Sequence, residues 1–590
     1  MRVTILKEIP EDATLASAWN GLVMRMDQPE VFFTYEWALA ASRAFRDTVD
    51  SLLFLVYEGE DLCGVAAMAT ANMAIAKKQS ASAFFLNAST ADYCDIVSIP
   101  EKRDAVLASL LQELRTLGMH RLVLANLPSD SPTLKELAAI SRKQHFHIAT
   151  RPAYQCGLIE FGSEDQRSVL LNNLTRKSRE QRALKRLSRI GAVQITHLST
   201  PEEIDRCLPQ VFAAQVSRFL ATARISPLIN NDRRLFLREL AGALSRAGWL
   251  KISQLEVNRI PVAWNYGFRF GESWFWYLPS FRVEYEDYSP GSCLLRLLVE
   301  EGCADRSLRR FDLGLGEEAY KSRFTTTVRP TSHVDLSSNV LRHTAVSMRQ
   351  ALTIGLARFP QAADRIRRAR DVLRAQTRRL KAEGLRATMA QAARRVVRLG
   401  GSRDEVLFFE GLAKDLRGDS DMRLSAITSD DLADAAMSNN SDPDTLQYLL
   451  RAAARLRHGK ACGFLLRSPD KQAVHFLAEA NLEGFHLSEI DYTLTAVDPG
   501  STLIFDCWTP QRFRGHGFYP LAIRQAAVEL LNEGKRPWIF CAASNTPSVR
   551  GILKAGFVYR HSLVRQRRLG HSTSAPAMTQ NSLYSTLPPQ

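Results

Sequence analysis

The stretch TLIFDCWTPQRFRGHGFYPLAIRQAAVELL, residues 502–531, predicts an apolar strand, a short polar loop and an amphipathic helix in direct succession. Two glycines of the loop, Gly515 and Gly517, allow the backbone to come close to a bound anion. The unpaired N–H groups of the helix's first turn point at such an anion, and Arg512 and Arg514 add positive charge nearby. This order of elements predicts a phosphate cradle, with a glycine turn that binds no ligand as the alternative.

The residues after this helix extend the pattern. A second strand, PWIFCAAS, leads to Asn545 and Ser548, and a further helix ends just before Gly556 and Phe557. The arrangement resembles the GNAT superfamily of acyl-CoA-dependent N-acyltransferases, in which a Gln/Arg-x-x-Gly-x-Gly/Ala loop binds the CoA pyrophosphate and an Asn after the next strand borders the cofactor groove. The resemblance implies that acetyl-CoA or another acyl-CoA is the co-substrate, in contact with Trp508, Arg512, Phe513, Arg514, Gly515, His516, Gly517, Asn545 and Ser548.

One position departs from the pattern of that superfamily. Many members carry a Tyr seven residues after the Asn, thought to protonate the leaving thiolate, and here that position is Ile552. Either another group serves as the acid, with Tyr519 and Tyr559 as candidates, or the domain binds CoA without catalysing well. The general base is expected among the carboxylates near the predicted strands, which are Asp506, Glu489 and Asp491.

A second motif, FDLGLGEEAYKSRF at residues 311–324, lacks the third glycine of a dinucleotide fingerprint and the Gly-Lys-Ser/Thr of a P-loop. Pro290-Gly291 stands before the preceding helix, and the motif spaces two glycines and a Tyr between Asp312 and Lys321. These elements resemble the CelD/BcsL-type acetyltransferases, a GNAT-like family associated with the biosynthesis of cellulose and other exopolysaccharides.

This second resemblance covers about residues 1–335. Pro290 and Gly291, followed by a helix, are the candidates for an anion cradle in this part of the chain. Asp312 and Lys321 are weak catalytic candidates, and the alternative is a structural ion pair that caps the turn. Four aromatic residues on neighbouring predicted strands form either a sugar-stacking platform or part of the core: Trp264, Trp274, Trp276 and Tyr277.

The composition narrows the class of protein. The chain of 590 residues is 45% hydrophobic and 24% charged, which is typical of a soluble globular protein. Its apolar runs stay shorter than the ~20 residues of a transmembrane helix, and its N-terminus lacks a signal-peptide pattern. Nine scattered cysteines without Cys-x-x-Cys spacing disfavour disulfides and a metal site, and favour the cytoplasm.

The formal net charge of +15 is concentrated in one segment. Residues 342–400 contain fifteen Lys/Arg and only three Asp/Glu, so most of the excess lies outside the predicted folded domains. This distribution does not indicate a specific nucleic-acid interface. The segment predicts a basic helical connector, which is either a solvated spacer or a surface attracted to an anionic membrane.

Alternating helix-like and strand-like segments predict an α/β fold with several GNAT-like mixed sheets. The expected organisation is a tandem pair of GNAT-like halves, the basic connector, a C-terminal GNAT domain and a disordered tail. The corresponding residues are 1–154, 155–335, 336–403, 404–568 and 569–590.

The sequence therefore predicts an acyl-CoA-dependent N-acyltransferase, an acetyltransferase of GNAT type, that acts on a sugar, an amine or an envelope precursor. One alternative is a FemAB-type aminoacyl transferase, which is less favoured because the basic charge lies in the connector and not in a groove. The other alternative is a non-catalytic CoA-binding scaffold of a polysaccharide synthase complex, which Ile552 in place of the usual Tyr motivates.

Overall fold

The computed structural model describes most of the predicted tandem pair and of the predicted C-terminal domain. The described residues are 1–72, 82–175, 179–316, 318–341, 343–344, 348, 402–412, 422–458, 462–488, 490–496, 498–568, 571–572 and 577–579. The predicted connector and tail fall largely outside these residues, and so does the base candidate Glu489. In the part of the chain that is described, no helix is long and apolar enough to cross a membrane.

The chain divides into two compact units, which are Met1–Arg218 with Pro227–Phe359, and Pro360–Gln590 with Phe219–Ser226. The strands of the first unit are β1 (Arg2–Leu6), β2 (Val49–Glu58), β3 (Asp61–Ala71), β4 (Ser82–Phe85), β5 (Val97–Ser98), β6 (Arg121–Pro128), β7 (His147–Glu160), β8 (Val193–Leu198), β9 (Leu250–Val257), β10 (Ile260–Phe270), β11 (Ser273–Phe281), β12 (Arg310–Leu315) and β13 (Thr327–Ser337). Its helices are α1 (Ala13–Met24), α2 (Tyr35–Ala44), α4 (Arg103–Thr116), α5 (Pro132–Lys143), α6 (Glu164–Thr175), α7 (Arg179–Ser188), α8 (Pro201–Ala221), α9 (Asn231–Arg246) and α10 (Pro290–Ala304).

The second unit has the strands β14 (Ser402–Gly411), β15 (Leu424–Ala426), β16 (Cys462–Arg467), β17 (Ala473–Asn481), β18 (His486–Leu487), β19 (Tyr492–Thr493), β20 (Ser501–Trp508), β21 (Arg536–Ala542), β22 (Phe557–Arg568), β23 (His571–Ser572) and β24 (Ala577–Thr579). Its helices are α13 (Ser429–Ser438), α14 (Pro443–His458), α15 (Phe518–Asn532) and α16 (Thr546–Lys554). Local sequence explains several boundaries. Thr428 and Asp431 form a reciprocal capping box at the start of α13, and Asn545 caps α16 through Ser548 N–H.

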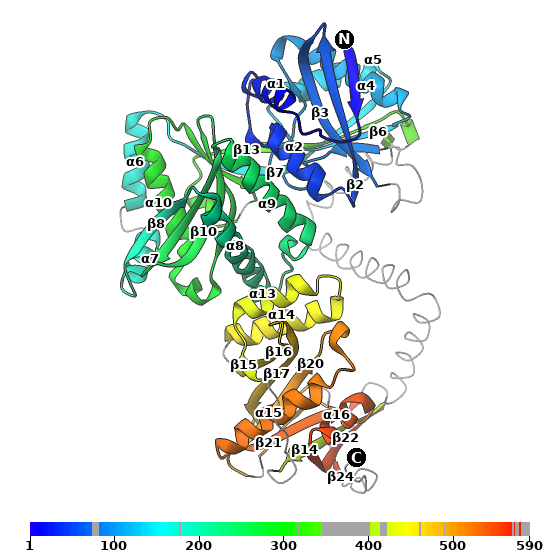
Figure 1. Ribbon diagram of the computed structural model, residues 1–590, viewed down its shortest axis with the longest axis vertical. Coiled ribbons are helices and arrows are strands. Elements are labelled where there is room, and N and C mark those ends of the chain that lie inside the picture. Colours follow the sequence, from blue (N-terminus) through cyan, green and yellow to red (C-terminus); the bar gives the residue numbers. More distant parts are fainter. Residues whose placement is uncertain are drawn as a thin grey trace. The chain divides into compact units, whose positions relative to one another are not determined.

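One continuous sheet joins the two halves of the first unit. Its strand order is β1-β2-β3-β4-β6-β13-β7-β12-β11-β10-β9-β8, with β5 paired to β3. The last strand, β13, returns to lie between β6 and β7, and β7 pairs on its other side with β12. Figure 1 shows β7 and β13 between the blue N-terminal half and the green second half. Strand β7 runs without a break across residues 154 and 155, so both halves share its backbone hydrogen bonds.

A strand–helix–strand unit with parallel pairing occurs three times. The pairs are β4 with β6 around α4, β11 with β12 around α10, and β20 with β21 around α15. Each parallel contact is short: Ser82–Phe84 faces Arg121–Val123, Ser273–Phe275 faces Arg310–Asp312, and Ser501–Ile504 faces Arg536–Ile539. Every other pairing in the two large sheets is antiparallel. The predicted α/β class with several mixed sheets is therefore confirmed.

Three of the four aromatic residues expected on a sugar platform lie in the core. Trp264 on β10 and Trp274 and Trp276 on β11 are each at most 2% exposed. Residues Val262–Phe268 of β10 are all buried, because this strand is central and covered on both faces. Of the two alternatives considered for these three rings, the structure therefore supports the core and not the sugar-stacking platform: alternation gives an exposed face only where one side of a sheet meets solvent.

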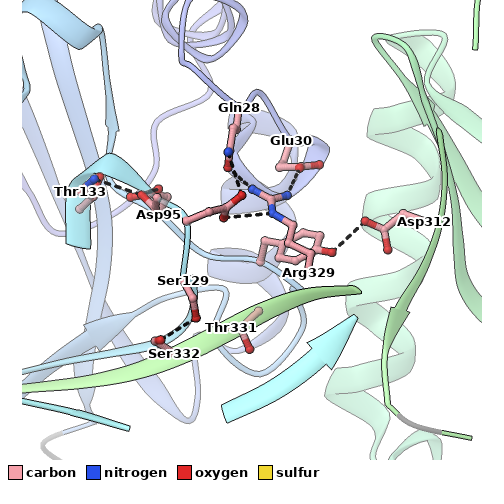
Figure 2. Close-up of polar contacts among 12 residues, drawn as sticks. Gln28, Glu30, Asp95, Ser129, Thr133, Asp312, Arg329, Thr331 and Ser332 are labelled. Carbon is pink, nitrogen blue, oxygen red and sulfur yellow. Dashed lines mark hydrogen bonds and ion pairs between the residues drawn. The ribbon is translucent and has the colours of Figure 1, made fainter. Parts of the chain in front are cut away.

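A buried ion network holds β13 against the first half of the unit. Arg329 on β13 pairs with Glu30 at 2.6 Å and with Asp130 at 3.3 Å, and it donates to Gln28. Its guanidinium also lies over the Tyr93 ring, 4.5 Å from the centroid. Figure 2 shows Arg329 reaching Gln28 and Glu30. Removing one partner of such a buried pair would leave an uncompensated charge, so the network strongly favours this position of the strand.

Candidate functional site

A cavity lies where β20 and β21 cease to pair. Beyond Ile504 and Ile539 both strands continue without mutual hydrogen bonds. On its other side β20 carries a bulge, because two residues, Asp506 and Cys507, stand opposite one residue of β17. Asp506 has a positive φ of 46°, as expected of a residue in an irregular bulge. The bulge and the divergence of the strands together open the sheet at this point.

The cavity has a volume of about 560 Å³ and is lined by groups from both faces of the sheet. Tyr519 of α15 and Ser548 of α16 line it from one face. Arg451 and Arg455 of α14 also line the cavity, and so do Phe485, His486 and Ser488 near β18. Ile504 and Ile539 belong to the core packed under α15, whereas Val406 belongs to the core on the opposite face. The cavity thus passes between the two strands from one core to the other.

The predicted phosphate loop precedes α15 beside this cavity. Gly515 and Gly517 have φ values of 84° and 80°, which favour glycine, and no atom lies within 4 Å of a Cβ built on either residue. Arg512, Arg514 and His516 are exposed. Helix α15 begins at Phe518, and its second residue, Tyr519, already lines the cavity. The loop is therefore open to solvent and continuous with the cavity.

Trp508 fixes the start of this loop. Its Nε1 donates to Thr445 Oγ1 at 2.9 Å, and its ring stacks on Tyr448 with 5.8 Å between centroids. The Arg514 guanidinium lies 5.0 Å from the Trp508 ring centroid, and its Nε donates to Thr509 O. Arg512 lies over the ring of Phe513 at 4.5 Å. These contacts place both arginines beside the glycine turn.

Tyr519 is the predicted acid that lies at the cavity. Its hydroxyl is 2.9 Å from Ser548 Oγ, and Asn545 Oδ1 in turn accepts from Ser548 N at 3.3 Å. Burial raises the pKa of Tyr519 well above its usual range, so the phenol keeps its proton near neutral pH. A Cβ on Gly551 would lie 2.5 Å from Tyr519 Cδ1, so the glycine allows α16 to pack directly on this ring.

The other acid candidate lies elsewhere. Tyr559 on β22 is 9% exposed, belongs to the core and contacts the Phe409 ring, and it does not line the cavity. Ile552 is fully buried in the same core. Of the two acid candidates, the structure therefore brings Tyr519, and not Tyr559, to the cavity.

Among the described base candidates, Asp506 lines the cavity and Asp491 does not. Asp491 is exposed and pairs with Arg565 at 3.2 Å. Asp506 pairs with Arg455 and, at 3.7 Å, with Arg451. Sequence reasoning missed both arginines. Their i, i+4 spacing on an amphipathic helix places them on one face, but nothing local connects that face to a strand some fifty residues later.

Two thiols also border the cavity, Cys507 and Cys541. Burial raises the pKa of both, to about 12 for Cys541. Because the thiolate is the reactive form of cysteine, neither is set up as a nucleophile.

In the first unit, Asp312 and Lys321 do not form the ion pair considered from sequence. Asp312 accepts hydrogen bonds from Tyr93 Oη at 2.9 Å and from Gly314 N at 2.8 Å. Lys321 Nζ donates to Leu315 O at 2.7 Å and pairs with Glu318 at 2.9 Å. In Figure 2 the dashed line from Asp312 marks its hydrogen bond with the Tyr93 hydroxyl.

Asp92 from the first half approaches the same turn, which the sequence did not reveal. Its Oδ2 lies 2.5 Å from a Cβ built on Gly314, and Leu315 N–H donates to its carboxylate. Burial and the nearby Asp312 charge raise the pKa of Asp92 to about 7, and burial and Glu30 raise that of Asp312 to about 6. The two carboxyls are thus coupled across the junction of the halves.

The second predicted anion cradle is more closed than the first. Pro290 is the first residue of α10 and is buried, and Ser289 before it has a φ of 52°. The N–H groups of Ser292 and Cys293 both donate to Ser289 O at 3.1 Å. A Cβ on Gly291 would lie 3.4 Å from Phe281 Cδ1. The N–H groups of Ser292 and Cys293 therefore already have a partner within the chain, as Leu521 N–H has in α15, where it donates to Gly517 O at 3.3 Å.

Comparisons with known proteins find similar solved structures and one family model that matches part of the chain. No curated protein matches the chain. Similar solved structures include FemX (10% identity, 57% of this chain and 97% of that chain, TM-score 0.41). They also include L-PGS from Bacillus licheniformis (10%, 57% and 96%, 0.36) and a tandem GNAT protein from the clavulanic acid biosynthesis pathway (11%, 57% and 99%, 0.34). Residues 175–322 match the family model of the acetyltransferase (GNAT) domain.

Proposed function

We propose that this chain is an acyl-CoA-dependent N-acyltransferase that transfers an acetyl or related acyl group to an amine of a sugar or another envelope or exopolysaccharide precursor. The observation that carries the proposal is the cavity between β20 and β21, which opens beside an exposed glycine turn at the start of α15. The GNAT match covers the equivalent unit β11–α10–β12. Its recurrence as β20–α15–β21 supports the assignment of a further GNAT domain to residues 404–568.

The pyrophosphate of the co-substrate would bind at the amides of the first turn of α15, flanked by Arg512 and Arg514. From there the pantetheine arm would follow Asn545 and Ser548 into the cavity. No atom lies within 4 Å of a Cβ built on Gly515 or Gly517, which supports this placement because a pyrophosphate needs close approach to the backbone. The proposal also includes the resemblance of residues 1–335 to the CelD/BcsL-type family. It further includes a cytoplasmic location of the protein.

In the proposed reaction the lone pair of the acceptor amine attacks the carbonyl carbon of the thioester. A C–N bond forms and the C–S bond breaks, so that an amide and the CoA thiol result. The amine loses one proton and the departing sulfur gains one. Tyr519 is placed to donate that proton, because its phenol is protonated and oriented by Ser548. The cavity holds both reactants in one enclosed space, which lowers the entropic cost of their encounter.

Two alternative functions differ from the proposed one in the donor that they use or in the absence of turnover. A FemAB-type enzyme would need a charged tRNA as donor, whereas a scaffold would bind CoA or a partner without turnover. The position of Tyr519 argues against the scaffold, because it supplies an acid where Ile552 replaces the usual Tyr. Turnover of acetyl-CoA in the absence of RNA would exclude the aminoacyl donor.

The test uses calorimetric titration of the full-length protein with acetyl-CoA. Gly517→Glu puts a carboxylate where the pyrophosphate would bind, so the dissociation constant should rise by about tenfold or more. Gly534→Glu is the matched control. Gly534 lies just beyond the other end of α15, has a φ of 74°, and has no atom within 4 Å of its Cβ position. Absence of binding by the wild type, or an equal loss in both variants, would contradict the proposal.

A further inference from the structure

We propose that the acceptor of the cavity between β20 and β21 is a small molecule that carries both an amine and an anionic group, a carboxylate or a phosphate, and that Arg451 binds the anionic group. This inference rests on the proposed function and names the class of its acceptor. It concerns the part of the cavity lined by α14, opposite Tyr519 and the predicted CoA groove.

The charges in the cavity wall are unbalanced. Among the lining residues, Arg451 and Arg455 both pair with Asp506, so two guanidiniums share one carboxylate. Arg455 and Asp506 are partly buried, at 24% and 23% exposure, and form the close pair. A cavity wall with one positive charge in excess favours an anionic ligand, and a low local dielectric strengthens that preference.

Of Arg451, Arg455 and Asp506, Arg451 is the residue whose side chain can still contact an anionic ligand. Its side chain is 52% exposed, and its ion pair among the described residues is the 3.7 Å contact with Asp506. Its guanidinium also lies 5.8 Å from the centroid of the Tyr448 ring. A guanidinium carries five N–H donors in a planar fork that matches a carboxylate or phosphate. Most of the donors of Arg451 are therefore not used within the described part of the protein.

A buried hydroxyl lies next to these charges. Tyr448 is fully buried, and its hydroxyl has no hydrogen-bond partner among the described residues. Both arginines lie over its ring, at 5.8 and 5.9 Å, and burial and the Asp506 charge raise its pKa. An unpaired buried hydroxyl is unfavourable, so the hydrogen-bonding groups beside the arginines are not all satisfied by the described part of the protein.

The positions of these charges favour a ligand that carries both an amine and an anionic group. Asp506 lies on β20 at the bulge, where the strands diverge, and Arg451 lies one helical turn from Arg455 on α14. An acceptor whose anionic group contacts Arg451 can present its amine to Asp506, at the opening between the strands where the thioester is proposed to lie. A neutral amine lacks the first contact, and an anion without an amine lacks the second. The wall therefore favours an aminosugar phosphate or an amino acid over their neutral counterparts.

Two pairs of probes separate the anionic groups in a calorimetric binding experiment on the full-length protein, with and without saturating CoA. Glucosamine 6-phosphate is compared with glucosamine, and L-serine with L-serinamide. The anionic member of at least one pair should bind about tenfold or more tightly than its neutral partner. The pair that shows the difference identifies phosphate or carboxylate as the group recognised.

Arg451→Gln should abolish this difference and leave the affinity for the neutral member unchanged. Arg451→Lys keeps the charge without the planar fork and should retain part of the difference. Arg423→Gln is the matched control, because Arg423 is an exposed arginine of the same unit that does not line the cavity. Equal binding within both pairs, no binding of any probe, or the same effect from Arg423→Gln would overturn the inference. Failure of CoA to bind would instead contradict the proposed function, because the probes are also titrated without CoA.

Discussion

The hydroxyl of Tyr93 donates a hydrogen bond of 2.9 Å to Asp312 Oδ2, although 219 residues separate the two. Tyr93 follows β4 in the first half of the unit, and Asp312 lies on β12 in the second half. Asp312 is fully buried, so this bond supplies one of the few donors that its carboxyl can reach. Because Arg329 lies over the same Tyr93 ring, the contact also joins Asp312 to the ion network of β13.

Tyr93→Phe should therefore lower the free energy of unfolding of the first unit by about 1–3 kcal/mol, because it leaves a buried carboxyl oxygen without its donor. The ring beneath Arg329 is retained, so the change isolates the hydroxyl. Tyr154→Phe is the control: Tyr154 is 54% exposed and should change stability by less than about 0.5 kcal/mol. Urea unfolding of the two variants measures the difference, and equal effects would show that the Tyr93–Asp312 bond contributes nothing.

The raised pKa of Asp92 predicts a specific dependence of stability on pH. Its folded value of about 7 lies above the ordinary 3.8, so the folded protein binds the proton more tightly than the unfolded chain. The resulting stabilisation is complete below about pH 4 and is lost as the pH rises through about 7. Asp92→Asn mimics the neutral carboxyl, so at pH 8 it should be more stable than the wild type by roughly 1–2 kcal/mol.

That advantage should shrink as the pH is lowered to 5, where the wild-type carboxyl is itself protonated. Thermal and urea unfolding at several pH values between 5 and 8 give the comparison. The control is Asp61→Asn, the same substitution at an exposed position on β3, measured at the same pH values. A pH-independent difference for Asp92→Asn would mean that Asp92 is ionised throughout this range.

Gly314 combines a positive φ with a close neighbour, and the two effects can be separated. Gly314→Ala should be destabilised both by its φ of 68° and by a Cβ placed 2.5 Å from Asp92 Oδ2. Gly271→Ala has a φ of 54° and open space around the Cβ, so it should show the backbone cost alone, about 1–2 kcal/mol. The free energies of unfolding of the two variants should differ by about 1 kcal/mol or more. Equal losses would show that Asp92 moves aside freely.

Local patterns in the sequence were sufficient to predict the α/β class of the fold. The strands expected at the start of residues 502–531 and at PWIFCAAS correspond to β20 and β21. The return of β13 to a place between β6 and β7 could not be predicted, because alternation marks a strand without identifying its partner. For the same reason Trp264 and Trp274 were assigned to a possible surface: an alternating strand looks alike at the edge and at the centre of a sheet.

The candidate site was predictable where its residues are adjacent in the chain. The glycine turn and the start of α15 are one continuous stretch, and its open geometry follows from local conformation. Arg451 and Asp92 reach their sites only through tertiary packing, from segments far away in the sequence. Charged residues are mostly solvated, so composition gave no reason to select Arg451.

The two cysteines at the cavity should be dispensable for the reaction. Burial holds Cys507 as a thiol, so a covalent acyl-cysteine intermediate is not expected. Cys507→Ala should keep kcat within about threefold of the wild-type value. Mass spectrometry of the protein after incubation with acetyl-CoA should show no acyl adduct on Cys507 or Cys541. A stable adduct on either, together with a large loss of kcat in Cys507→Ala, would require a two-step mechanism.

If Tyr519 protonates the leaving thiolate, Tyr519→Phe should lower kcat by about 100-fold and change the KM for acetyl-CoA by less than about threefold. The reason is that the ring, its packing on Gly551 and the cavity wall are retained, and only the proton donor is lost. Tyr559→Phe is the matched control, because it removes a hydroxyl from the same core without touching the cavity, and its kcat should be nearly unchanged. Since burial raises the pKa of Tyr519, the wild-type rate should not fall through deprotonation of this group until well above pH 10. A parallel rise in KM would instead assign Tyr519 to co-substrate binding, and equal losses of kcat in both variants would reduce its role to packing.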